Sequence, residues 1–201
     1  MQIDKVAWRA VISTLCAIAV LCLGLYLVGA LAFPPTMMRI SYETGNDKGA
    51  MKYAYRAYKT TGELHYLGFA TRVAIGIDNL EDVDYYGSVL ASSDGFEQYC
   101  LEIDEKEGYA DGTYELYIST KLVVVKYALG EKVEAKEYAF ESLNGGFPQN
   151  NAVIALLFSA MQAEDTETES YIIGELRNMT VSNEAEQQYL NNILEAYDLE
   201  K

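Results

Sequence analysis

The stretch "GNDKGAMKYAYRAYKTTG" (residues 45–62) has a second copy in "GEKVEAKEYAFESLNGG" (residues 130–146), at a constant offset of 85 in sequence number. Each copy has a glycine, an alanine five residues later and then the triplet Tyr-Ala-aromatic. Small residues recur at spacings of four and three, which places them on one stripe of a helix, where a second helix can approach closely. These residues are Ala50, Ala54 and Ala57 in the first copy and Ala135, Ala139 and Ser142 in the second. The repeat predicts paired helices with glycine in the turn, and it favours packing over ligand binding for the tyrosines beside the stripe.

Helical periodicity continues along the rest of the chain. After Pro35, apolar residues recur mostly three and four positions apart, which predicts eight or nine helices joined by short turns. The expected breaks are Gly45 and Asn46, Gly62, Asp78 and Asn79, Asp94 and Gly95, residues 108–112, Gly130, residues 145–148, Asp165 and Ser182. The stretch "TKLVVVKYAL" (residues 120–129) is rich in β-branched residues and could form a strand. It belongs to a longer periodic segment without a partner strand nearby, so the prediction is an all-α fold.

The N-terminal segment is apolar over a length that can cross a bilayer. As a helix, residues 11–33 would span roughly 35 Å at about 1.5 Å per residue. We therefore expect residues 1–35 to hold a cytoplasmic N-terminus and a single transmembrane anchor, which contacts the lipid bilayer through residues 11–33. Lys5 and Arg9 precede the apolar run, so the positive-inside rule exports the body. Pro34 and Pro35 should end or kink the helix.

A cleaved signal peptide is the alternative for this segment. Ala30, Leu31 and Ala32 have the small-x-small form of a cleavage site, and cleavage near Ala32 would release a secreted protein. The apolar run is longer than the usual core of a signal peptide, about 7–15 residues, which favours a retained anchor.

Charge and cysteine content exclude several classes of function. The formal net charge is -15, and because residues 1–33 contribute +1, the body carries -16. A body this acidic argues against nucleic-acid binding and disfavours adsorption to anionic lipid. Cys16 and Cys22 lie in the apolar run, so the body has only Cys100 and can form neither a disulfide framework nor a multi-cysteine zinc site.

The second copy resembles the tetratricopeptide repeat (TPR), a 34-residue helix-turn-helix unit with small residues at the helix crossing. Tyr127, Leu129 and Gly130 are similar to the end of that family's first helix, and residues 79–92 are a weaker copy at an offset of about 33. The offset of 85 is not a multiple of 34, and residues 93–112 depart from the pattern. The resemblance implies an α-solenoid of antiparallel helical hairpins over residues 36–201, which follows the transmembrane helix expected from the apolar run. Residues 182–201 are polar on one face and suit a capping helix.

The sequence has few residues in arrangements typical of catalytic or metal-binding sites. His65 is the only histidine, with no cysteine or nucleophile-elbow serine near it in sequence. Asp104 and Glu115 have the end spacing of a calcium loop, but Tyr109 occupies the place of the required glycine, so a solvated loop is expected. Cys100 has carboxylates nearby, which raise a thiol pKa, so we expect it to be buried rather than reactive. The sequence predicts no enzyme activity, no cofactor or metal, and no small-molecule substrate.

Partner binding is the function that the resemblance implies. The first helix of each TPR unit lines a concave surface, which here would carry Tyr117, Thr120, Val124 and Tyr127. Packing of these residues against a neighbouring element is the equally open alternative. We expect a membrane-anchored, extracytoplasmic interaction module, a scaffold or adaptor for a protein or peptide with a basic or polar segment. The alternative is a structural subunit of a stable membrane protein complex.

Overall fold

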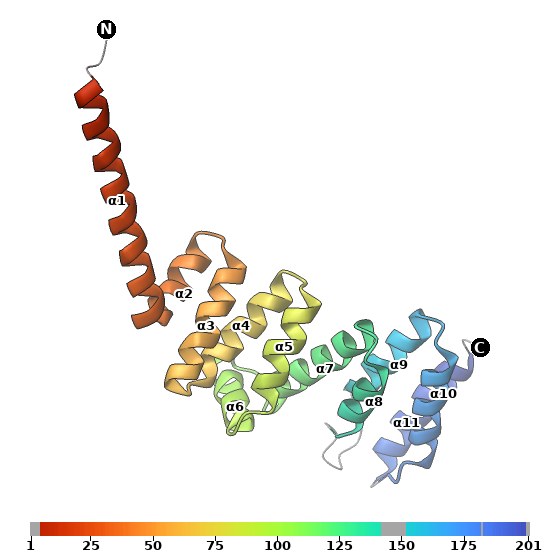
Figure 1. Ribbon diagram of the computed structural model, residues 1–201. Helices are drawn as coiled ribbons and strands as arrows, with labels where there is room; N and C mark the ends of the chain where they lie inside the picture. Colours follow the sequence, from red (N-terminus) through yellow and green to blue (C-terminus); the bar gives the residue numbers. More distant parts are fainter. Residues whose placement is uncertain (1–4, 142–151, 182, 200–201) are drawn as a thin grey trace. The chain divides into compact units, whose positions relative to one another are not determined.

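The computed structural model describes residues 5–141, 152–181 and 183–199, and every regular element in these ranges is a helix (Figure 1). The helices are α1 Lys5–Ala32, α2 Pro34–Glu43, α3 Asp47–Thr61, α4 Leu64–Gly76, α5 Leu80–Ala91, α6 Phe96–Glu107, α7 Thr113–Ala128, α8 Lys132–Glu141, α9 Ala152–Gln162, α10 Thr166–Asn178 and α11 Glu184–Leu199. The expected all-α fold is therefore confirmed for the described residues.

The number of helices is larger than expected. Within the described ranges ten helices follow α1, rather than eight or nine, because every segment between the predicted breaks contains a helix, including α6 between Gly95 and Gly108. The predicted breaks that fall on described residues lie at helix boundaries. Those at residues 145–148 and at Ser182 lie outside the described residues.

The β-branched stretch of residues 120–129 is helical, since nearly all of it belongs to α7. α7 packs against α5, α6, α8 and α9. Leu122, Val123 and Val125 on this helix are at most 5% exposed. A helix covered on several sides can be apolar over most of its circumference, so these residues serve helix packing without a sheet.

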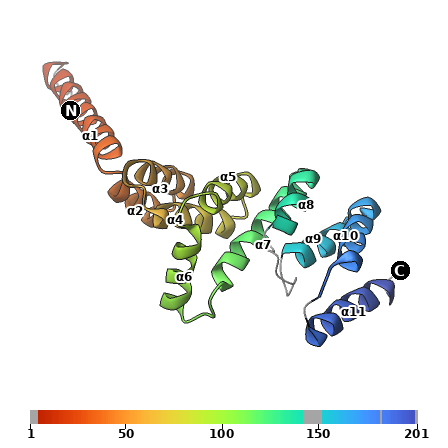
Figure 2. The same cartoon turned by 90° about the horizontal axis from the view of Figure 1, so that it is seen from below.

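α1 contains one apolar span, Trp8–Gly29, whose 22 residues are long enough to cross a membrane. None of this span is buried inside the protein, and Figures 1 and 2 show α1 beside α2 only near its C-terminal end. Pro34 and Pro35 begin α2, where proline is tolerated because the first amides of a helix have no partner within it. The predicted end of the apolar helix at these prolines is confirmed.

The first compact unit comprises Met1–Ile77. In this unit α3 packs against both α2 and α4. Ala50, Ala54 and Ala57 of α3 are fully buried, at 0% exposure. The first alanine stripe is therefore a packing surface, as its spacing predicts.

The end of α1 is attached to this unit by a pair of tyrosines. The hydroxyl groups of Tyr26 in α1 and Tyr53 in α3 are 2.7 Å apart and hydrogen-bonded. Burial of Tyr53 is completed by Met37 and Met38 of α2. The bond fixes the middle of α3 beside the last turns of the apolar helix.

The second compact unit comprises Asp78–Lys201. Its main core joins residues of α7, α8, α9, α10 and α11. Ala135 and Ala139 of α8 are fully buried there, so the second alanine stripe also packs, while Ser142 lies outside the described residues. A partly buried ion pair of 2.6 Å between Lys126 and Asp84 joins α7 to α5.

The turns after α2, α6, α7 and α9 share one backbone geometry. Gly45, Gly108, Gly130 and Glu164 have φ angles of 74°, 74°, 86° and 54°. In each turn this residue donates its N–H to the carbonyl three residues back, and the following residue donates to the carbonyl five residues back. This is the Schellman arrangement, which satisfies the last carbonyls of a helix. Gly130 and Glu164 are separated by 34 in sequence number, whereas Gly45 and Gly130 are separated by 85.

Charge is divided unevenly between the two units. Residues 34–77 hold six basic and three acidic side chains, a net charge of +3. Residues 78–201 hold seven basic and 26 acidic side chains, a net charge of -19. The acidity of the body therefore resides in the second unit, whereas the positive charge of the first unit does not oppose adsorption to anionic lipid.

Candidate functional site

The four residues predicted to bind a partner lie on α7 in different environments. Tyr117 is 40% exposed, Thr120 and Val124 are half-buried, and Tyr127 is 8% exposed within the core of the second unit. The ring of Tyr117 stacks on Tyr114, with 6.1 Å between ring centroids. The structure thus leaves the first three residues accessible and places Tyr127 in the interior. Their role in partner binding stays a prediction.

Tyr127 belongs to a polar network that joins α7, α8 and α10. Its hydroxyl donates to Asp165 Oδ2 at 2.9 Å, and Lys132 Nζ lies 2.8 Å from the same oxygen. Asp165 also caps α10, because its Oδ1 accepts the backbone N–H of Thr168 at 3.2 Å. The hydrogen bond from Lys132 is the main reason that the pKa of Asp165 lies well below its usual range. Burial, and then the bond to Asp165, raise the pKa of Tyr127 to about 12.

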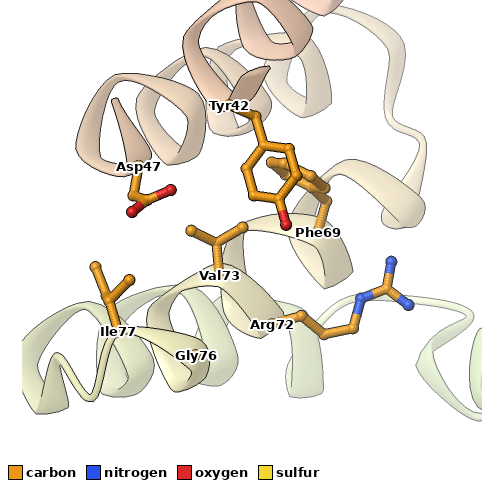
Figure 3. Close-up of a pocket in the computed structure, with 7 residues that line it drawn as sticks. All are labelled: Tyr42, Asp47, Phe69, Arg72, Val73, Gly76 and Ile77. Carbon is orange, nitrogen blue, oxygen red and sulfur yellow. The ribbon is translucent and has the colours of Figure 1, made fainter. Parts of the chain in front are cut away.

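A groove of 540 Å³ lies in the first unit, between the end of α2 and α4 (Figure 3). It is lined by Tyr42, Asp47, Phe69, Arg72, Val73, Gly76 and Ile77. The rings of Tyr42 and Phe69 meet edge to face, with centroids 5.2 Å apart and an interplanar angle of 77°. Tyr42 is 52% exposed, so much of its ring surface remains available to a ligand.

Opposite charges stand on the two sides of this groove. Figure 3 shows Asp47 and Arg72 on opposite sides of Val73. Neither side chain forms an ion pair with another residue in the described ranges. The groove therefore offers an apolar floor with one anionic and one cationic group at its margins.

A second groove, of 360 Å³, lies in the second unit between α9 and α11. It is lined by Ile154, Leu157, Phe158, Met161, Tyr189, Asn192, Ile193, Ala196 and Tyr197. Most of these side chains are apolar, and Phe158 is 58% exposed. An exposed phenylalanine on the wall of an apolar groove is typical of a binding surface.

The α9 side of this groove corresponds to the positions predicted on α7. Ile154, Phe158 and Met161 follow Thr120, Val124 and Tyr127 at an offset of 34 in sequence number, the same spacing that separates Gly130 from Glu164. Ile154, Phe158 and Met161 were not predicted from the sequence, because glutamate occupies the place of glycine in the second turn and hides the offset. The expected break at Asp165 was the available signal for it.

The acidic stretch around Asp104 is not the solvated loop that was expected, because residues 102–107 belong to α6 and Asp104 connects this helix to α7. Asp104 is fully buried, and its Oδ1 accepts the backbone N–H of Tyr114 at 2.9 Å in the first turn of α7. Cys100 on the same helix is 1% exposed, as expected. Burial, with the nearby charges of Glu115 and Asp104, raises its pKa to about 12. A thiol held protonated in this way is a packing residue and a poor nucleophile.

His65 lies at the surface, with its Nδ1 3.3 Å from Glu63 Oε2 and both side chains more than half exposed. In residues 5–141, 152–181 and 183–199, no group of three or more His, Cys, Asp or Glu side chains is placed to hold a metal ion. Two accessible features of the described residues have the shape of a binding site, and these are the grooves lined by α2 and α4 and by α9 and α11. No protein-family model, no curated protein and no solved structure matches this chain.

Proposed function

We propose that the protein is a membrane-anchored interaction module that binds a segment of another protein in a groove between helices. The observation that carries this proposal is Phe158, an aromatic side chain that is 58% exposed on the wall of the groove between α9 and α11. Burial of such a side chain by a partner is a common source of binding energy at interfaces.

A TPR-like solenoid is the arrangement we propose for the second unit. The spacing of Gly130 and Glu164, 34 in sequence number, equals the period of that repeat and supports the proposal. In such a stack α7 and α9 are the first helices of successive units, α8 and α10 are the second helices, and α11 takes the place of the next first helix and closes the end. Grooves between neighbouring first helices then lie on the concave side, which repeat proteins use for binding.

The charge of the second unit defines the chemistry of its partner. With a net charge of -19 over residues 78–201, this unit attracts basic segments and repels acidic ones. We propose that the partner segment carries apolar side chains that enter the groove and basic residues on either side of them. Binding of this kind weakens as salt concentration rises, because the surface charges are screened.

We propose that the body lies outside the cytoplasm. Lys5 and Arg9 precede the apolar core of the span Trp8–Gly29, and positive charges there favour a cytoplasmic N-terminus. The partner is then an extracytoplasmic protein or the extracytoplasmic part of a membrane protein.

Site-specific photo-crosslinking of the full-length chain tests the proposal. A photoreactive amino acid at position 158 should give a discrete crosslinked protein, whose yield falls when salt is raised. The same amino acid at Glu175, an exposed position on α10, is the matched control. Equal products from both positions contradict the groove assignment. A complex that survives purification in mild detergent at high salt would favour the structural-subunit alternative over a transient module.

A further inference from the structure

We propose that a basic face of α3 binds anionic phospholipid headgroups of the membrane that α1 crosses. This basic face consists of Lys48, Lys52, Arg56 and Lys59. Spacings of four, four and three place these residues on one side of the helix. All four are exposed, whereas the opposite side of α3 is buried through its alanine stripe.

The attachment of α3 to α1 sets its distance from the membrane. Tyr26 lies three residues before the end of the apolar span Trp8–Gly29, about 5 Å along the helix at 1.5 Å per residue. Its hydroxyl is 2.7 Å from that of Tyr53. Tyrosine is enriched at this level of a bilayer, where the apolar ring and the polar hydroxyl meet different surroundings. The middle of α3 is therefore held at the lipid–water interface.

The basic face begins beside Tyr53. At 3.6 residues per turn, Lys52 and Arg56 lie about 100° and 60° around the helix from Tyr53, and both are displaced from it in the same direction. Lys48 and Lys59 are five and six residues from Tyr53, within about 9 Å along the helix axis. The headgroup layer is roughly 5–8 Å thick on each side of the bilayer, and charges interact over a further 8–10 Å at physiological salt. All four positive charges thus fall within reach of lipid phosphates.

Local charge favours this contact. Asp47 is the only acidic residue in α3, and residues 34–77 carry a net charge of +3, whereas residues 78–201 carry -19. Lys59 Nζ lies 5.3 Å from the ring centre of Tyr55 and 5.8 Å from that of Tyr58. These aromatic rings hold a cation at the surface and are themselves residues that favour the interface. The inference requires α1 to cross a bilayer, and it is independent of partner binding in the grooves.

Fluorescence quenching in reconstituted bilayers tests this inference on the full-length chain. A fluorophore on Thr60→Cys, at an exposed position of α3, reports contact with headgroup-labelled quencher lipid, with Cys16 and Cys22 replaced by alanine. Quenching should increase when anionic phospholipid is added to zwitterionic bilayers. Each exposed lysine contributes about fivefold to affinity for an anionic surface, so K48Q/K52Q/K59Q should lose roughly 100-fold. That loss should abolish the increase.

The matched control is K106Q/K121Q/K136Q, which removes the same number of lysines from the second unit and should keep the increase. Circular dichroism of both triple variants checks that they remain folded. Equal quenching of the unmodified chain in zwitterionic and anionic bilayers overturns the inference, as does an increase that survives in K48Q/K52Q/K59Q. Displacement by inorganic phosphate at constant ionic strength also overturns it, because the basic face would then recognise a soluble anion rather than the membrane.

Discussion

Gly130 and Glu164 occupy the same place in two helix turns, at positions that differ by 34 in sequence number. Both have a left-handed backbone, with φ angles of 86° and 54°, and both donate to the carbonyl three residues back. Glycine adopts this conformation without steric cost, whereas another L-residue loses about 1–2 kcal/mol there. The same left-handed turn is thus formed by Gly130, which adopts it without strain, and by Glu164, which adopts it at a steric cost.

Exchange of these residues should change stability in opposite directions. A Cβ added at Gly130 would meet no atom within 4 Å, so Gly130→Ala tests the left-handed backbone without a steric clash. We expect it to lower the free energy of unfolding by about 1 kcal/mol, and Glu164→Gly to raise it by up to about 1 kcal/mol after the added freedom of the unfolded chain is counted. Urea unfolding of the full-length chain in mild detergent measures both. A loss of stability in Glu164→Gly would contradict the equivalence of the two turns.

The two alanine stripes should respond alike to overpacking. Ala54 and Ala139 are both fully buried, on α3 and α8. Leucine at either position forces extra carbons into a filled contact, which typically costs about 1–3 kcal/mol. Lys52→Leu and Glu137→Leu, at positions of the same two helices that are less buried than the alanines, are the controls and should stay within about 0.5 kcal/mol of the unmodified chain. If the alanine variants were as mild as these controls, the stripes would not be close helix crossings.

Helices, turns and buried stripes could be predicted because they depend on local features. The spacing of Ala50, Ala54 and Ala57 and the glycines of the turns specify which side of a helix packs and where it ends. The relation between the turns at Gly130 and Glu164 was not predicted, because the residue that completes it is a glutamate rather than the glycine that marks the other turn. Backbone hydrogen bonds determine that turn, and many residue types can make them at some cost in strain.

The candidate site was predictable only in part for a related reason. On α7 the sequence selected Tyr117, Thr120, Val124 and Tyr127, but periodicity does not tell which neighbours cover a helix. Tyr127 is covered in a core where its hydroxyl reaches Asp165, a residue far along the chain. The residues that are exposed in the groove, above all Phe158, lie on α9 rather than on α7.

Asp165 should make stability depend on pH in acid. Its pKa is lowered from the usual 3.8 by the bond from Lys132, so below about pH 4 the unfolded chain takes up a proton before the folded one. Stability from the ionised carboxylate is therefore present above pH 4 and lost as pH falls through the folded-state pKa. Asp165→Asn should cost about 1–2 kcal/mol at neutral pH, and the difference from the unmodified chain should shrink in acid.

Unfolding by urea at a series of pH values measures this effect. Asp111→Asn, in the exposed turn before α7, is the control and should give a curve parallel to that of the unmodified chain. A constant difference between Asp165→Asn and the unmodified chain from pH 7 to pH 2 would contradict the assignment of a lowered pKa.

The orientation of α1 can be tested with one engineered cysteine. Asp111→Cys should react with a membrane-impermeant thiol reagent added outside intact cells, because we place the body outside the cytoplasm. The native cysteines give little background, since Cys16 and Cys22 lie within the apolar span and Cys100 is 1% exposed. If Asp111→Cys reacts only after the membrane is broken, the body lies in the cytoplasm and the proposed orientation is wrong.

Leu157 and Phe158 are neighbours on α9 that separate packing from binding. Leu157 is 3% exposed, whereas Phe158 is 58% exposed, although both line the same groove. Truncation of Leu157 to alanine removes buried carbons and should lower the free energy of unfolding by about 2–5 kcal/mol. Phe158→Ala removes a mostly solvated ring and should change the free energy of unfolding by no more than about 0.5 kcal/mol.

If the groove binds a partner, Phe158→Ala should nonetheless weaken binding by about 2 kcal/mol or more, as loss of an interface anchor does. Urea unfolding and affinity for the crosslinked partner measure the two quantities separately. A large loss of stability in Phe158→Ala would make it a packing residue, and unchanged affinity in a stable Phe158→Ala would remove this groove from the binding surface.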